Sequence, residues 1–181
     1  TDAEAAYGLA WAHSEDNFLK IQEPLLASRN LLGSVNGKDG ALLDVVSFLI
    51  KSDEIVREKY ESSFSPEFKK ILEAYSAALN RYAELHPEEV LHKKLFPVSP
   101  IDIVKGYFLS MAFISNVHFD LGRLFQTQMD PIRIVNPDKM PAGSNGFAYA
   151  PHKTEEGKTI LVSNSHQPFR SYLSWYEIHI N

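Results

Sequence analysis

The sequence contains no cysteine and no long apolar run. The absence of cysteine excludes disulfides, zinc–thiolate sites and a cysteine nucleophile. No stretch approaches the ~20 consecutive apolar residues that a membrane span requires. The longest candidate, residues 45–50, is short and flanked by charge, which predicts a segment of a core helix. Basic residues are also few: 18 Lys and Arg against 23 Asp and Glu give a net charge of −5. We therefore expect no membrane span and no nucleic-acid partner, since nucleic-acid-binding surfaces are usually basic.

The N-terminal two thirds of the chain, up to about residue 126, have the pattern of helices. The run Ser65-Pro66-Glu67 is a helix start, because serine caps the first turn and proline needs no hydrogen-bond acceptor there. His86-Pro87 ends this helix. Apolar residues at helical spacing predict one buried face, made of Phe68, Ile71, Leu72, Tyr75, Leu79 and Tyr82.

A second helix start lies at residues 99–102, where Asp102 stands in the position of a capping box with Ser99. The helix that follows, through Met111, is apolar on nearly all sides, which predicts deep burial. Gly33 and residues 36–37, Asn-Gly, punctuate the helices nearer the N-terminus.

The pattern changes in the last third. Residues 127–143 contain three prolines and predict a loop. Residues 147–149 and 159–162 predict two short strands joined by a polar loop, and residues 171–180 alternate as a third strand. Trp175 within it is expected to be a core aromatic, like Trp11 in the helical part. The fold class expected is α+β, a helical chain followed by the first strands of a sheet.

Three motifs are considered together: Gly143-Ser144-Asn145-Gly146, the segment 7–22 (YGLAWAHSEDNFLKIQ), and His166, which lies 22 residues after Ser144. Taken alone, the first motif favours a plain turn, because these residues dominate turns. Taken together, the motifs resemble the penicillin acylase family of N-terminal-nucleophile hydrolases, which includes the acyl-homoserine-lactone acylases. The resemblance is specific at both ends of the chain and weak in the middle.

The resemblance implies that a precursor cuts itself between Gly143 and Ser144. Ser144 then becomes a new N-terminus and the nucleophile, with its own α-amine as base, because that amine titrates near pKa ~7.7–8.0. His166 is expected to be the second catalytic residue and to contact the nucleophile region. The implied organisation is a helical α-chain over 1–126, a linker over 127–143, and the start of the catalytic β-chain of an αββα sandwich over 144–181. An unbroken chain is expected to be inactive, since an amide nitrogen is no base.

The resemblance also implies an acyl-binding pocket. Its matching positions are Met111, Ile114, Ser115, Phe147 and Gln167. Plain core packing remains the alternative, above all for Met111, because methionine commonly fills cores. The substrate would be a small N-acyl compound: a β-lactam, an acyl-homoserine lactone or a lipopeptide.

Metal ligands are not indicated by any spacing motif. His118 with Asp120, and His13 with Glu15 and Asp16, are more typical of a solvated face. We expect no cofactor in this chain. Calcium is possible in the full-length enzyme, because some family members bind it through an acidic residue near the position of Asp120.

The sequence departs from the family in lacking the downstream segment that carries the asparagine, the arginine and the main oxyanion donors. The remainder of that β-chain is thus an expected partner. No signal peptide is visible, but family members are commonly periplasmic or secreted. Two other interpretations stay open, a non-catalytic helical binding module and an inactive relative of the family.

Overall fold

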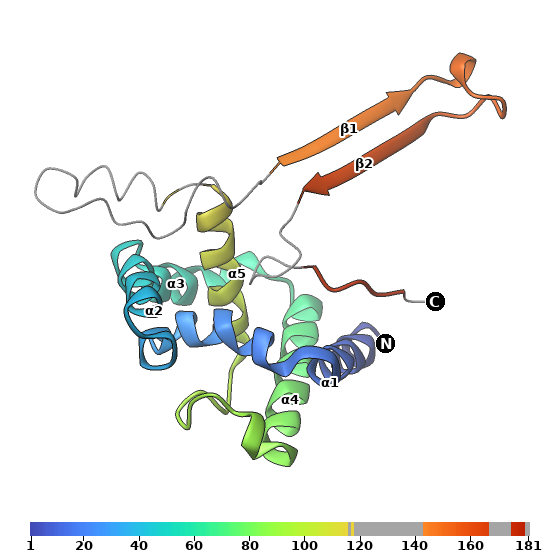
Figure 1. Cartoon of the computed structure of the whole chain (residues 1–181). Coiled ribbons are helices and arrows are strands. Elements are labelled where there is room, and N and C mark those ends of the chain that lie inside the picture. Colours follow the sequence, from blue (N-terminus) through green and yellow to red (C-terminus); the bar gives the residue numbers. More distant parts are fainter. Residues whose placement is uncertain (116, 118–142, 167–174, 180–181) are drawn as a thin grey trace, which may run out of the picture. The chain divides into compact units, whose positions relative to one another are not determined.

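The computed structural model describes residues 1–115, 117, 143–166 and 175–179 (Figure 1). It divides into two compact units: Thr1–Ile134 with Tyr176–Asn181, and Val135–Trp175. Each unit is described by itself below. The chain is mostly helical with a small antiparallel sheet, which confirms the α+β class.

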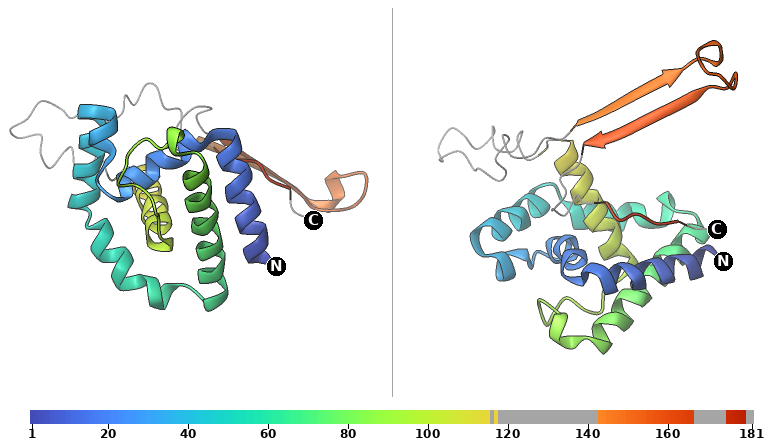
Figure 2. Two further views of the ribbon diagram at one scale, coloured as in Figure 1. Left: turned by 90° about the horizontal axis from the view of Figure 1, so that it is seen from below. Right: turned by 45° about the vertical axis from the view of Figure 1, so that its right-hand side comes forward.

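The first unit consists of helices. They are α1 (Asp2–Ser28), α2 (Leu32–Leu49), α3 (Ser52–Ser63), α4 (Pro66–Leu85), the 3-10 helix η1 (Pro87–Glu89) and α5 (Pro100–Ile114). Helix α1 packs along α4 and also contacts α5 and α2, while α5 contacts α3 (Figure 2). None of the helices in the described part of the chain has the length and apolar character to cross a membrane.

The predicted helix boundaries near α4 and α2 are confirmed. The Ser65 hydroxyl accepts a hydrogen bond from the Phe68 N–H at 3.2 Å, with Pro66 in the first turn, and His86 ends the helix. Helix α2 is interrupted at Gly37, whose φ of 63° lies in the left-handed region that glycine tolerates. The two halves of α2 approach so closely that a Cβ on Gly40 would collide with the Leu32 carbonyl.

The core of the first unit lies between α1, α4 and the segment before α5. Phe18, Leu26, Leu79 and Leu95 are fully buried, and the Phe18 ring packs against Tyr82 with ring centroids 4.8 Å apart. The buried amide of Gln22 accepts from Leu91 N at 2.8 Å and donates to the Glu89 carbonyl at 3.0 Å. Its hydrogen bonds therefore fix the loop after α4 to α1.

Three apolar expectations were wrong in part. Phe68, in the first turn of α4, is 43% exposed, and its ring stacks on Phe64. Residues 45–50 bury Val46 but leave Phe48 74% exposed, so only one side of this helix faces the core. Helix α5 was expected to be deeply buried, but only one side of it is. Tyr107, Met111 and Ile114 on the other side are exposed.

The contrast between Leu79 and Leu85 on α4 gives a prediction for stability. Leu79→Ala should lower the free energy of unfolding by about 2–5 kcal/mol, because Leu79 is fully buried and its truncation leaves a cavity. Leu85→Ala, the same change on the same helix at 47% exposure, should cost well under half as much. Urea unfolding curves of both variants measure this, and equal losses would contradict the assignment of the core.

The second unit is a two-stranded antiparallel hairpin. Its strands are β1 (Gly143–Tyr149) and β2 (Ile160–His166), in the register Gly143↔His166 to Tyr149↔Ile160. The strands were predicted at these places but are longer than predicted. The connection contains the 3-10 helix η3 (Pro151–Lys153) and turns at Gly157, where φ is 66°.

The third strand predicted over 171–180 is absent from the described residues 175–179. Tyr176 instead contacts α1: its ring stacks on His13 with centroids 4.2 Å apart, and its hydroxyl donates to the Asp16 carboxylate at 2.5 Å. Trp175 is 74% exposed, so the prediction of a core aromatic was wrong there. Of residues 175–179, Tyr176 is half-buried and the other four are exposed.

Candidate active site

Ser144 lies at the second position of β1, one residue after the strand begins. Its cross-strand partner is Ser165, and Gly143 before it pairs with His166. The Gly143–Ser144 bond is thus at the open end of the hairpin, opposite the end of β2. Ser144 itself is exposed.

The two faces of the hairpin differ in composition. Side chains alternate along a strand, and directly opposed residues share a face. The register therefore gives Ser144 a face of mostly small residues, namely Gly146, Ala148, Leu161, Ser163 and Ser165. The other face carries the large side chains and two asparagines, namely Asn145, Phe147, Tyr149, Ile160, Val162, Asn164 and His166. The small face leaves room next to the Ser144 hydroxyl.

His166 is on the large-residue face, and its ring lies beside Asn145. The Asn145 Nδ2 and His166 Nε2 atoms are 3.0 Å apart in a hydrogen bond across the strands. The Asn145 Nδ2 group carries two N–H donors. When His166 Nε2 is unprotonated, it therefore accepts a hydrogen bond from Asn145. The structure thus joins His166 to the residue after Ser144, while the Ser144 side chain projects from the opposite face.

The predicted acyl-pocket residues are divided between the units. Phe147 is in the hairpin, 57% exposed, on the same face as Asn145 and His166. Met111, Ile114 and Ser115 are in or directly after the last turn of α5 in the first unit, and Met111 is 52% exposed. Met111 is therefore not a core residue of the first unit, and the alternative of plain core packing does not account for a methionine at this position. Gln167 lies outside the described residues, as do His118, Asp120 and all of the predicted linker except Gly143.

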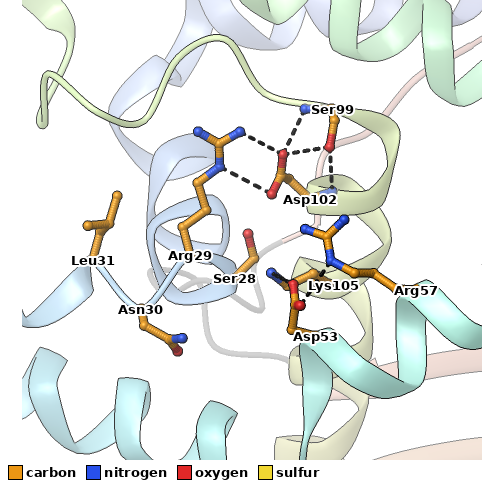
Figure 3. Close-up of a pocket in the computed structure, with 9 residues that line it drawn as sticks. All are labelled: Ser28, Arg29, Asn30, Leu31, Asp53, Arg57, Ser99, Asp102 and Lys105. Carbon is orange, nitrogen blue, oxygen red and sulfur yellow. Dashed lines mark hydrogen bonds and ion pairs between the residues drawn. The ribbon is translucent and has the colours of Figure 1, made fainter.

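Helix α5 is held at its N-terminal end by Arg29, at the end of α1 (Figure 3). The guanidinium donates from Nε to Asp102 Oδ1 at 3.1 Å and from Nη2 to Asp102 Oδ2 at 2.8 Å. It also donates to the carbonyls of Lys94, Leu95 and Pro97. All five guanidinium N–H donors are therefore used, and the loop before α5 is tied to α1.

Asp102 also completes the capping box predicted from the sequence. Its Oδ2 accepts from the Ser99 N–H at 2.8 Å and from the Ser99 hydroxyl at 2.7 Å, and the Asp102 N–H points back to that hydroxyl at 3.4 Å. Burial alone would raise the pKa of Asp102, but the hydrogen bonds from Arg29 and Ser99 outweigh it and lower that pKa below its ordinary value. The carboxylate is ionised at neutral pH.

Possible metal ligands were also located. The group of His13, Glu15 and Asp16 on α1, for which the sequence favours a solvated face, has protein partners: Glu15 accepts from the Trp11 indole, and Asp16 accepts from the Tyr176 hydroxyl. Among the described residues, His86, Glu88 and Glu89 bring one ring nitrogen and two carboxylate oxygens within 4.8 Å of one another. This cluster is at the surface, and sequence reasoning did not predict it.

Comparison with known protein families gives a match to the family described as penicillin amidase, over residues 1–181. The chain belongs to this family. Members of the family are hydrolases that act on amide bonds, so at this level the protein is an acylase-type hydrolase with a small-molecule substrate.

Sequence reasoning missed the role of Arg29 and the charged residues that surround it. Asp102 was recognised as a capping residue, but its partner 73 positions earlier in the chain was not. One signal was available: Lys105 is the only charged residue after Asp102 in an otherwise apolar helix. A charge in such a helix must meet an opposite charge when it is buried, and Lys105 does, at Asp53.

Proposed function

We propose that the protein is an N-acyl amide hydrolase that cuts itself between Gly143 and Ser144 and then uses Ser144 as its N-terminal nucleophile. The observation that carries this proposal is the position of Ser144: exposed, at the open end of a hairpin, on a face of small side chains, in a chain of the penicillin amidase family. The hairpin would be the first two strands of the αββα sandwich.

The proposed reaction has two acyl transfers. The α-amine of the processed Ser144 takes the proton from its hydroxyl, and the hydroxyl oxygen attacks the substrate carbonyl carbon. The C–N bond breaks, the leaving amine receives the proton, and an ester forms on Ser144. Water then attacks this ester and releases the carboxylic acid. Processing uses the same oxygen, which attacks the Gly143 carbonyl carbon. The Gly143–Ser144 C–N bond breaks, the hydroxyl proton passes to the freed Ser144 nitrogen, and water then cleaves the ester that joins Gly143 to the Ser144 oxygen.

The exposed face of α5 supports an acyl-binding role for its last turn. Tyr107, Met111 and Ile114 recur at helical spacing and remain open in the first unit. Apolar surface of this kind is normally covered by a partner or a ligand. We propose that Met111, Ile114 and Ser115, with Phe147 and Gln167, line the pocket for an aliphatic or aromatic acyl group. The proposed compartment is the periplasm or the exterior of the cell.

Mass spectrometry of the full-length gene product tests the proposal. We expect two chains, the second beginning at Ser144, and a covalent acyl adduct on that second chain after brief exposure to an N-acyl substrate. A panel of penicillins and acyl-homoserine lactones of different acyl lengths identifies the acyl group. A single uncut chain without turnover would instead support an inactive relative of the family.

The hydrogen bond between Asn145 and His166 predicts coupled effects on turnover. We propose that His166 acts through Asn145 to position the start of the strand on which Ser144 lies. In the processed enzyme, Asn145→Ala and His166→Ala should each lower kcat by up to ~10²-fold, the typical cost of a misplacement of about 1 Å, with little change in KM. The double variant should be no worse than the poorer single variant, because both remove one interaction.

Asn164→Ala is the matched control for this pair. Asn164 is directly opposite Asn145 on the same face, but within the described residues its side chain makes no hydrogen bond. Its removal should leave kcat within a few-fold of the parent. Independent, multiplicative losses for Asn145→Ala and His166→Ala would argue against positioning through this bond.

A further inference from the structure

A polar pocket of about 430 Å³ lies in the first unit, between the end of α1, helix α3 and the N-terminal half of α5 (Figure 3). Its charged lining residues are Arg29, Asp53, Arg57, Asp102 and Lys105. Three cationic side chains therefore face two carboxylates, and the pocket has a surplus of one positive charge. The sequence as a whole is acidic, with a net charge of −5, so this surplus is local.

The hydrogen bonds show which cations are available to a ligand. Arg29 has already used all five donors on Asp102 and on three backbone carbonyls. Lys105, only 5% exposed, donates to Asp53 Oδ1 at 2.8 Å, its one partner among the described residues. Within the described ranges of the chain, Arg57 donates from Nε alone, to Asp53 Oδ2 at 2.9 Å. Both Nη groups of Arg57 and two ammonium protons of Lys105 are thus left without a described acceptor.

Both carboxylates that line the pocket already accept hydrogen bonds. Asp102 accepts from Arg29 and Ser99, and Asp53 accepts from Lys105 and Arg57 with one oxygen each. The pocket therefore has spare donors and no spare carboxylate, and an anion would satisfy those donors. A guanidinium edge matches the two oxygens of a carboxylate in a bidentate pair.

We propose that this pocket binds a small organic carboxylate, held by the Nη groups of Arg57 and by Lys105. A single negative charge balances the surplus, whereas a dianion such as phosphate would be repelled by the neighbouring Asp53 and Asp102. The apolar side chain of Leu31 also lines the pocket and provides a contact for the organic part. All the residues that line this pocket belong to the first unit, whereas the proposed nucleophile belongs to the second.

Arg57→Gln tests the site without removing a core residue. Arg57 is 58% exposed and its ion pair is of the surface type, so the variant should fold like the parent. Arg81→Gln is the matched control, because Arg81 is 55% exposed and pairs with Glu84 on α4, away from the pocket lining. The full chain is titrated with sodium acetate, sodium phosphate and sodium chloride at constant ionic strength.

Acetate should raise the melting temperature in a saturable way relative to chloride, because a ligand that binds only the folded state stabilises it by mass action. Phosphate should have a weaker effect. Arg57→Gln should weaken the acetate affinity about tenfold or more, the usual result of losing a charge-assisted hydrogen bond, while Arg81→Gln leaves it unchanged. The proposal is overturned by any of three results: equal shifts with acetate and chloride, a stronger effect of phosphate, or equal losses in the two variants.

Discussion

Ser144→Ala in the full-length protein is expected to yield a single uncut chain with no measurable amide hydrolysis. The hydroxyl oxygen is the attacking atom in both proposed reactions, and the alanine side chain has no nucleophilic atom in its place. Loss of the nucleophile in acyl-transfer enzymes lowers kcat by as much as ~10⁶-fold. Intact-mass analysis measures the cleavage, and a substrate assay on a panel of acyl lengths measures the hydrolysis.

Ser165→Ala provides the control, because Ser165 is the cross-strand partner of Ser144 on the same small-residue face. This variant should still cut itself and should keep most of its turnover. If Ser144→Ala still gives two chains and an active enzyme, the nucleophile has been assigned to the wrong residue. If both serine variants lose cleavage and turnover equally, the loss comes from a change to this face of the hairpin, and the hydroxyl of Ser144 has no special role.

Asp102→Asn is expected to destabilise the first unit by roughly 3–5 kcal/mol, the cost of breaking a buried ion pair by removing one partner. Asp102 is 5% exposed, and the change would leave the Arg29 guanidinium without its carboxylate while the capping box loses its charged member. Urea unfolding at neutral pH measures the loss. Glu84→Gln, which breaks the exposed pair with Arg81, should cost no more than about 1 kcal/mol.

Acid should produce a related effect in the parent protein. The pKa of Asp102 is lower in the folded state than in the unfolded chain, so its contribution to stability is complete above the ordinary aspartate value near 4. That contribution is lost as the pH falls through the lower, folded-state pKa. The Asp102→Asn variant should therefore show a shallower loss of stability in this acidic range. An equal slope in both proteins would contradict the assignment.

Local signals predicted the elements well. Ser65-Pro66 and the pair Ser99 and Asp102 predicted two helix starts because a cap acts within one turn of its own sequence. The hairpin followed from two apolar runs separated by polar residues. Helix caps and hairpins depend on residues that are close together in the sequence. Such residues can be recognised from the sequence alone.

Partners that are distant in the sequence were not predicted. Nothing near Arg29 indicates that its guanidinium meets Asp102, or that Tyr176 contacts Asp16. Alternation in residues 171–180 predicted a strand, but the described residues 175–179 form none, and Tyr176 contacts α1. The faces of the hairpin also required the register, because a shift of one residue would exchange the sides of Ser144 and His166. The family resemblance supplied the candidate site, while the structure supplied its arrangement.

The different environments of the two ends of α5 have a consequence for laboratory evolution of this protein. At one end, Arg29 serves five acceptors in a planar fork, so lysine at this position would keep the charge and lose most of the geometry. At the other end, Met111 and Ile114 are exposed, where substitutions usually change stability by under ~0.5 kcal/mol. Libraries that vary the last turn and preserve residue 29 should therefore retain a high fraction of folded members. If the last turn lines the acyl pocket as proposed, such libraries would vary the acyl preference while the hydrogen bonds of Arg29 stay intact.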